Sequence, residues 1–161
     1  MDEALRPTAV DPPRGFFPAR VDEKGRLKLP AAFQQYLNDI GEKRVFITTL
    51  DVATVRIYPN SLWKQNENFF DERSLTDPER SENIAFLADH YGADSEVDSQ
   101  GRLLVPQELR RELNLENQPV WLNHYKGRIN LYGKEEYDRR MQRARANAPA
   151  DLRELEKMGL R

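Results

Sequence analysis

The sequence of 161 residues predicts an α+β fold built from two copies of one module. The main observation is a repeat: VDEKGRLKLP at residues 21–30 returns as VDSQGRLLVP at residues 97–106, with six of the ten positions identical. Each copy ends in a proline that can open a helix, and two β-rich runs separated by a turn come later. Each half is about 75 residues long, which is marginal for independent stability, so we expect the halves to pack on each other or on neighbouring chains.

The first module begins with a β-hairpin. Asp22-Glu23-Lys24-Gly25 has aspartate first and glycine fourth, which is typical of a type I turn. Pro30 opens a short helix, and Asn60 and Asp77-Pro78 mark two further helix starts. We therefore expect strands at residues 16–21, 26–29, 45–50 and 55–58, and helices from Pro30, from Asn60 to about Phe70, and from Pro78 to about Gly92.

The second module repeats this order of elements. Its turn is Asp98-Ser99-Gln100-Gly101, and Pro106 opens its first helix. Leu131-Tyr132 matches Ile57-Tyr58 at an offset of 74, so the repeat covers whole modules and not only the turn. We expect strands ending at Val97 and at residues 102–105, 120–125 and 128–132, and helices from Pro106, from Glu135 to about Ala146 and, short and frayed, from Asp151 to Met158.

These elements divide the chain into four parts. Residues 1–13 contain three prolines and few apolar residues, and we expect them to form a mobile N-terminal extension. The two modules follow, and a short tail comes last. We place the first module with its helices at residues 14–91, the second module at residues 92–146 and the C-terminal tail at residues 147–161.

The composition excludes several classes of protein. The sequence has no cysteine, which excludes disulfides and cysteine zinc sites and suits a reducing cytoplasm. Its start, MDEALRPTAV, lacks the basic and apolar regions of a signal peptide, and no apolar run approaches the length of a membrane span. We therefore expect a cytoplasmic protein with no membrane partner.

The net charge of −2 hides an uneven distribution of charged residues. Residues 60–96 carry a charge of −6, whereas residues 14–28 carry +3. The basic region attracts polyanions and the acidic region repels them, unless the acidic residues simply solvate a surface. The basic side chains of the first region are Arg14, Arg20, Lys24, Arg26 and Lys28.

Each turn places an aspartate four residues before an arginine, and two interpretations remain open. In the structural one, Asp22 and Asp98 hydrogen-bond the backbone of their own turns and form ion pairs with the arginines. Gly25 and Gly101 are structural in either case, because the exit of such a turn needs a positive φ.

In the functional interpretation, Arg26 and Arg102 bind nucleic acid. A guanidinium offers a planar fork of donors that matches phosphate or the edge of guanine, and a two-stranded β-ribbon fits the major groove of DNA. Lys24 and Lys28 would add phosphate contacts in the first module. The second module has Leu104 where the first has Lys28, so its turn is less basic.

Two copies of D-x-x-G-R, each followed by a strand, a proline and a short helix, resemble the MraZ family. Further matches are Arg14-Gly15, seven residues before Asp22, and LNHYKGRINLYGKEEY at residues 122–137. The resemblance runs from Arg14 to about Arg140. It implies two tandem AbrB-like swapped-hairpin modules, which form a β-barrel with short flanking helices and a pseudo-two-fold repeat.

The resemblance also implies a function. Members of this family are bacterial transcriptional regulators that act on the promoter of the division and cell-wall gene cluster, bind tandem direct repeats in DNA and assemble into rings. By motif match the DNA-contacting residues are Arg26 and Arg102, assisted by Lys24 and Arg14, while Asp22 and Asp98 hold the turns.

The sequence departs from the family pattern at two places. An extension of about eleven residues precedes Arg14. The basic residue often found four positions after the first proline is Gln34 here, whereas its counterpart in the second module is Arg110, a further candidate for DNA contact.

A protein with so few cations in each module should bind DNA as an assembly. One turn offers two or three positive charges, and their effect fades with salt. Linking several weak modules raises avidity by roughly 10²–10⁴ without new contacts. We therefore expect multivalent binding, which the resemblance to the MraZ family implies takes the form of a ring oligomer that represses its own promoter and is associated with the nucleoid. The acidic stretch at residues 60–96 would then face away from DNA.

Motifs for other chemistry are missing from the sequence. It contains no Gly-rich phosphate loop, nucleophile elbow or paired-carboxylate motif, so we expect neither an enzyme nor a cofactor or small-molecule substrate. His90 and His124 have no ligand partner at a useful spacing, so structural roles are expected and no metal site.

Two alternative functions use the same hairpins. An antitoxin-like AbrB regulator usually has one such module and a toxin-binding tail, whereas two modules fill this chain. A ring-forming interaction protein would use its turns to bind protein instead of DNA. The basic run at residues 138–146 fits a solvated helix end, or a contact with DNA or a neighbouring subunit.

Overall fold

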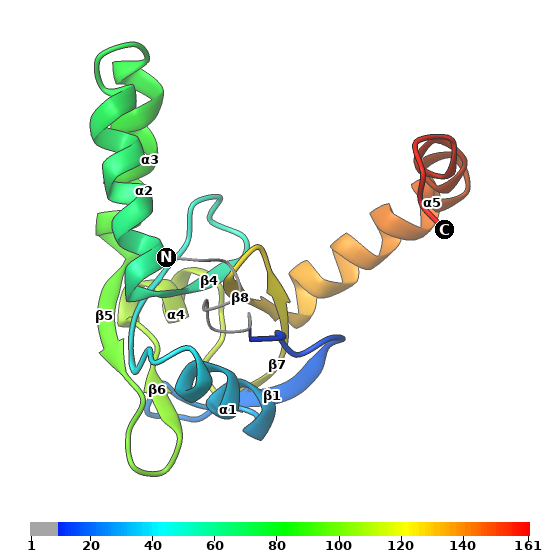
Figure 1. The fold of residues 1–161 in the computed structure, drawn as a ribbon. Helices are drawn as coiled ribbons and strands as arrows, with labels where there is room; N and C mark the ends of the chain where they lie inside the picture. The colour runs from blue at the N-terminus through cyan, green and yellow to red at the C-terminus, as the bar shows by residue number, and fades with distance from the viewer. Residues whose placement is uncertain (1–9) are drawn as a thin grey trace, which may run out of the picture.

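Eight antiparallel strands form one sheet in the order β5-β3-β4-β8-β7-β1-β2-β6 (Figure 1). The computed structural model describes residues 10–161, so most of the predicted N-terminal extension lies outside the described residues. The strands are β1 (Phe17–Val21), β2 (Arg26–Lys28), β3 (Arg44–Thr48), β4 (Val55–Pro59), β5 (Ala93–Glu96), β6 (Arg102–Leu104), β7 (Gln118–Tyr125) and β8 (Arg128–Gly133). The helices are α1 (Ala31–Asp39), α2 (Asn60–Arg73), α3 (Pro78–Tyr91), α4 (Gln107–Glu112) and α5 (Lys134–Lys157).

The first hairpin of each module is inserted into the sheet of the other module. Strand β1 pairs with β7 of the second module, and β5 pairs with β3 of the first. The two short strands β2 and β6 pair with each other, centred on Leu27 opposite Leu103. Strands β4 and β8 also pair, centred on Arg56 opposite Asn130. These pairings repeat about a pseudo-two-fold axis and confirm the predicted α+β fold of swapped-hairpin modules.

One hydrophobic core serves both modules. Leu27 and Leu103 are fully buried at the centre of the β2–β6 pair, and inward-facing residues of β1, β3, β4, β7 and β8 join them. Burying a side chain of this size stabilises the fold by about 1.5–3 kcal/mol. Because the core draws on both halves of the chain, the expectation that the halves pack on each other is met. Val10, the first described residue, also packs against this core.

Two helical projections leave the barrel in different directions (Figure 1). Helices α2 and α3 form an antiparallel hairpin, hereafter the arm, which is anchored at its base by Trp63 and Ala88. Trp63 stacks on Phe46 of β3, with 4.6 Å between the ring centroids. Helix α5 leaves from the end of β8. Within residues 10–161, none of the helices has the length and apolarity that a membrane span requires.

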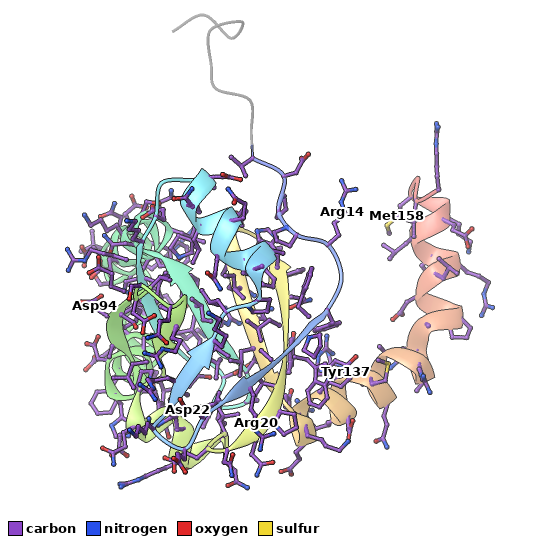
Figure 2. All side chains as sticks on the ribbon, turned by 90° about the horizontal axis from the view of Figure 1, so that it is seen from below. Arg14, Arg20, Asp22, Asp94, Tyr137 and Met158 are labelled. Atoms are coloured by element: carbon purple, nitrogen blue, oxygen red, sulfur yellow. The ribbon has the colours of Figure 1, made fainter. Side chains whose placement is uncertain are left out.

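The prediction for the C-terminal helices was wrong. We expected a helix to end near Ala146 and a separate one to begin at Asp151, but α5 continues from Lys134 to Lys157 with Pro149 inside it. Proline removes one backbone hydrogen bond and usually kinks a helix, whereas the surrounding Ala, Arg, Leu and Glu residues favour helix strongly. The helix therefore continues past Pro149. Figure 2 shows that the helix is bent between Tyr137 and Met158.

Candidate functional site

The two turns have the same hydrogen-bond pattern. Oδ1 of Asp22 accepts bonds from the backbone N–H groups of Lys24 (2.9 Å) and Arg26 (2.8 Å), and Oδ2 accepts one from Nε of Arg26 (3.1 Å). In the second turn, Asp98 accepts from the N–H groups of Gln100 and Arg102 (2.9 Å each) and from Nε of Arg102 (3.0 Å). These are the contacts that the structural interpretation expects of each aspartate–arginine pair.

Both turns also need their glycines. Gly25 has φ of +84° and Gly101 has φ of +76°, which is the left-handed region that residues with a Cβ rarely adopt.

The turns hold the carboxylates of Asp22 and Asp98 in their charged form. Backbone hydrogen bonds, above all from Arg26, lower the pKa of Asp22 below its ordinary value of 3.8, and those from Arg102 do the same for the pKa of Asp98.

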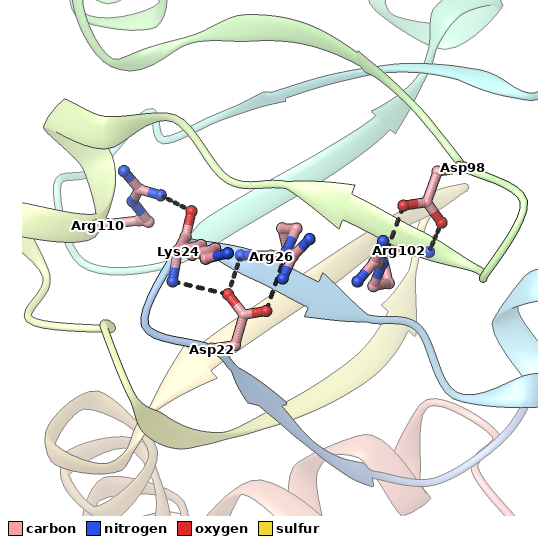
Figure 3. A network of polar contacts seen from close by, with 6 residues as sticks. All are labelled: Asp22, Lys24, Arg26, Asp98, Arg102 and Arg110. Carbon is pink, nitrogen blue, oxygen red and sulfur yellow. Dashed lines mark hydrogen bonds and ion pairs between the residues drawn. The ribbon is translucent and has the colours of Figure 1, made fainter.

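The ion pairs leave part of each guanidinium exposed. The side chain of Arg26 is 34% exposed and that of Arg102 is 26% exposed. Each uses Nε to reach its aspartate, and within residues 10–161 the terminal nitrogens of both form no hydrogen bond. The terminal N–H groups of both guanidinium groups are therefore available to bind a ligand (Figure 3).

Pairing of β2 with β6 brings the basic residues of both modules to one surface. Because Leu27 and Leu103 point inward, their neighbours along each strand point outward. Lys28 lies opposite Arg102, and Arg26 lies opposite Leu104. We call this surface the cationic face; it consists of Lys24, Arg26, Lys28 and Arg102, with Asp22 and Asp98 at its two sides (Figure 3).

Comparison with known proteins decides the family. A relative from Anaeromyxobacter dehalogenans, named "Transcriptional regulator MraZ", is 34% identical over 140 residues, which is 85% of this chain and 92% of that protein. The chain belongs to the MraZ family. The resemblance stated from the two turns is thereby confirmed.

Other MraZ comparisons agree. The family model described as "MraZ protein, putative antitoxin-like" matches residues 92–156. A relative from Acidobacterium capsulatum with the same name is 39% identical over 97 residues, 60% of this chain and 66% of that protein. A third, from Koribacter versatilis, is 31% identical over 106 residues, 65% of this chain and 71% of that protein.

Arg110 of this MraZ chain supports the first turn from the other module. Its Nη1 donates a hydrogen bond to the backbone carbonyl of Lys24 (2.9 Å), and its side chain is only 12% exposed. Its Nε lies 3.6 Å from Oε1 of Glu116. At the equivalent place in the second turn, the side chain of Gln34 covers Gly101. DNA contact by Arg110 stays a prediction, and the structure adds a contact within the protein.

The remaining predicted residues lie at different distances from the cationic face. Nζ of Lys28 donates a hydrogen bond to the carbonyl of Gln100, so this lysine joins its own strand to the second turn. Arg14 is exposed, but Figure 2 shows it at the other end of the barrel from Asp22. The structure therefore does not bring Arg14 together with the turns.

Arg20 was not among the predicted site residues, although it lies near Asp22 (Figure 2). Its exposed Nη2 donates hydrogen bonds to the carbonyl and Oδ1 of Asn117 (2.9 and 3.0 Å). The signal available in the sequence was alternation, because Arg20 precedes the inward-facing Val21 and so must face outward.

The two histidines have ordinary protein contacts. Nε2 of His124 lies 3.3 Å from the hydroxyl of Tyr36, and burial lowers the pKa of His124. The ring of His90 packs edge-on against Tyr91. In the described part of the chain, no three His, Asp or Glu side chains gather closely enough to hold a metal ion.

Proposed function

We propose that this chain is a DNA-binding transcriptional regulator that contacts promoter DNA through the cationic face. The observation that carries the proposal is the β2–β6 pairing, which presents Arg26, Lys28 and Arg102 on one exposed two-stranded surface. A two-stranded antiparallel ribbon is narrow enough to enter the major groove. The MraZ relatives are named as transcriptional regulators, which supports this reading of the surface.

The aspartates prepare the arginines for this contact. Asp22 holds Nε of Arg26, and Asp98 holds Nε of Arg102, so that each guanidinium plane is oriented before DNA arrives. The terminal nitrogens then form a fork that suits two phosphate oxygens, or O6 and N7 of guanine. An arginine that is already ordered loses less entropy on binding, which favours affinity.

The limited charge of one face supports multivalent binding. Four cations are accompanied by Asp22, Glu23 and Asp98, so a single copy neutralises few phosphates. We propose that several copies assemble into a ring and engage tandem direct repeats upstream of the division and cell-wall gene cluster, repressing it. Such a protein works in the cytoplasm, associated with the nucleoid, and needs neither a cofactor nor catalysis. The acidic arm would point away from DNA.

A binding titration tests the proposal. Fluorescence anisotropy is measured with a labelled duplex from the region upstream of the gene and with a scrambled duplex, at several salt concentrations. We expect preference for the upstream duplex and a steep loss of affinity with salt. Arg26→Ala should abolish specific binding while circular dichroism stays unchanged, and Arg102→Ala should also weaken it strongly, because Arg102 lies opposite Lys28.

The matched control is Arg153→Ala, which removes an exposed arginine from the far end of α5. It should bind the upstream duplex as the unmodified chain does. Equal binding to both duplexes, or full binding by Arg26→Ala, would exclude the proposed interface. In that case an antitoxin-like regulator or a ring-forming interaction protein would remain.

A further inference from the structure

A groove of about 550 Å³ runs along one face of the arm, from the turn between β7 and β8 at its base toward the end of α2 and the start of α3 at its tip. Its apolar lining comes mainly from the arm. Phe69 on α2 is 51% exposed and forms part of this lining. We call this site the arm groove; its apolar residues are Leu50, Leu62, Phe69, Phe70 and Ile84.

The rim of the arm groove is strongly basic. Five cations line it, namely Arg56, Arg73, Arg80, Lys126 and Arg128, and the one carboxylate among the lining residues is that of Asp77. Asp77 already pairs with Arg80, at 3.5 Å. Arg56 and Arg128 form no ion pair with any residue of the described chain, and burial together with the nearby Arg56 lowers the pKa of Arg128. The groove therefore suits an apolar ligand with negative charge on its borders.

The C-terminal end of α5 has the complementary pattern. After Pro149, the side chains of Leu152, Leu155 and Met158 are 49%, 51% and 80% exposed, respectively. At 3.6 residues a turn these three form one stripe along the helix. No residue of α5 is buried, so this stripe has no partner within residues 10–161.

Charge on this segment is sorted by face. With the same helical period, Asp151 lies within the stripe and Glu154 and Glu156 border it on either side. Arg153 and Lys157 start from the opposite face, and Nζ of Lys157 reaches back to Oε1 of Glu154 at 3.2 Å, so Asp151 and Glu156 are the acidic side chains of the segment without such a pair within residues 10–161. An apolar stripe with acidic borders matches an apolar groove with a basic rim, which is the pattern of helix-in-groove recognition.

A chain cannot fill its own groove in this conformation. Helix α5 begins at the end of β8, whereas the arm groove lies beside the turn that precedes β8. From there α5 runs away from the arm, so the C-terminal segment and the arm are on opposite sides of the barrel in both Figure 1 and Figure 2. The occupant must then be another molecule.

We propose that residues 150–158 of one copy dock into the arm groove of a second copy. This inference rests on the self-association included in the proposed function and names the two surfaces that make it. Each copy has one such segment and one groove, so the contact is head-to-tail. A head-to-tail contact extends from copy to copy and closes into a ring when the rotation between neighbours permits.

The test measures molecular mass in solution without DNA, by light scattering after size-exclusion chromatography. The unmodified chain should be larger than a dimer. Leu155→Asp in the segment and Phe69→Asp in the groove should each give a monomer. The matched control Arg153→Asp introduces the same residue on the opposite helix face and should keep the full mass.

Mixing the two defective variants gives the sharper result. The intact segment of Phe69→Asp fits the intact groove of Leu155→Asp, so an equimolar mixture should form a one-to-one dimer and nothing larger. If Phe69→Asp lost helical circular dichroism, Arg73→Glu would replace it, because a reversed charge on the rim opposes the acidic borders.

Three results would overturn the inference: a monomeric unmodified chain, an unchanged mass for Leu155→Asp, or a mixture that stays monomeric. A groove that binds a foreign protein instead would give the first of these. None of these measurements involves DNA, so failure of the docking contact and failure of the proposed DNA binding are seen separately.

Discussion

Arg110 donates a hydrogen bond to the backbone carbonyl of Lys24, although 86 residues separate them in the sequence. The bond joins α4 of the second module to the tip of the first turn. The position of that tip is therefore set by the other module.

Replacing Arg110 with alanine should destabilise the protein. The substitution removes a charged, largely buried donor from a carbonyl and from Glu116, a loss of about 1.5–3 kcal/mol in the free energy of unfolding. Urea unfolding followed by circular dichroism measures it. The control is Arg111→Ala, the exposed neighbour on the same helix, which should change stability by less than about 0.5 kcal/mol. Equal effects of the two substitutions would contradict a supporting role for Arg110.

Gly25→Ala should be more harmful than Gly41→Ala. Both glycines have a positive φ, but a Cβ at Gly41 meets open space, whereas one at Gly25 would overlap the guanidinium of Arg110. Strain in the left-handed region costs about 1–2 kcal/mol at either position. Displacement of Arg110 adds to this at Gly25.

A double-mutant cycle separates these two contributions at Gly25. Adding Arg110→Ala to Gly25→Ala should cost less than the sum of the single substitutions, because both remove the same contact. Strict additivity in urea unfolding would show that the overlap with Arg110 is unimportant.

The aspartates of the two turns should contribute to stability in a pH-dependent way. The pKa values of Asp22 and Asp98 are lowered in the folded chain, so the unfolded chain takes up protons first as the pH falls. Their contribution is complete above the unfolded pKa of about 3.9 and is lost as the pH drops through the folded pKa.

The measurement compares the unmodified chain with the double variant Asp22→Asn and Asp98→Asn. The difference in their free energies of unfolding should be constant from pH 5 to 7 and shrink below about pH 4. A difference that stayed constant through the acidic range would mean that the carboxylate charge is not involved.

Leu104→Lys should strengthen DNA binding. Leu104 is 57% exposed and lies opposite Arg26, at the position where the first module has Lys28. A lysine there adds one cation to the cationic face of each copy. The salt dependence of binding should then increase by about one phosphate contact per bound face. Leu104→Gln is the control, and an equal gain for both variants would assign the effect to polarity and not to charge.

Local features of this fold were predictable from the sequence, because they depend on neighbours along the chain. Asp22 and Asp98 bond to backbone groups two and four residues away, and a repeated motif marks both turns. The strands follow from alternation, and each of the first four helices begins at or next to a proline. Asn60 marks the start of α2 but does not cap it, because the N-cap position is Pro59 and no side chain caps the helix by a hydrogen bond. All of these features depend on residues that are close to one another in the sequence.

Contacts between modules could not be predicted in the same way. The sequence suggested that the second turn has the poorer basic surroundings, but strand pairing puts Lys28 beside Arg102. Arg20 and Asn117, 97 residues apart, meet only because β1 pairs with β7. The register between strands of different modules depends on how their side chains pack in the shared core. A short stretch of sequence does not contain this information.

The exchange of hairpins between modules has a consequence for how the protein is made. Strands β1 and β2 have their main partners in the other half of the same polypeptide, as β5 does. A pair of separate single-module chains would have to find each other by diffusion and would come apart on dilution. Here both modules are parts of one polypeptide, so the pairing of their strands is intramolecular. Formation of the barrel therefore does not depend on the concentration of the protein.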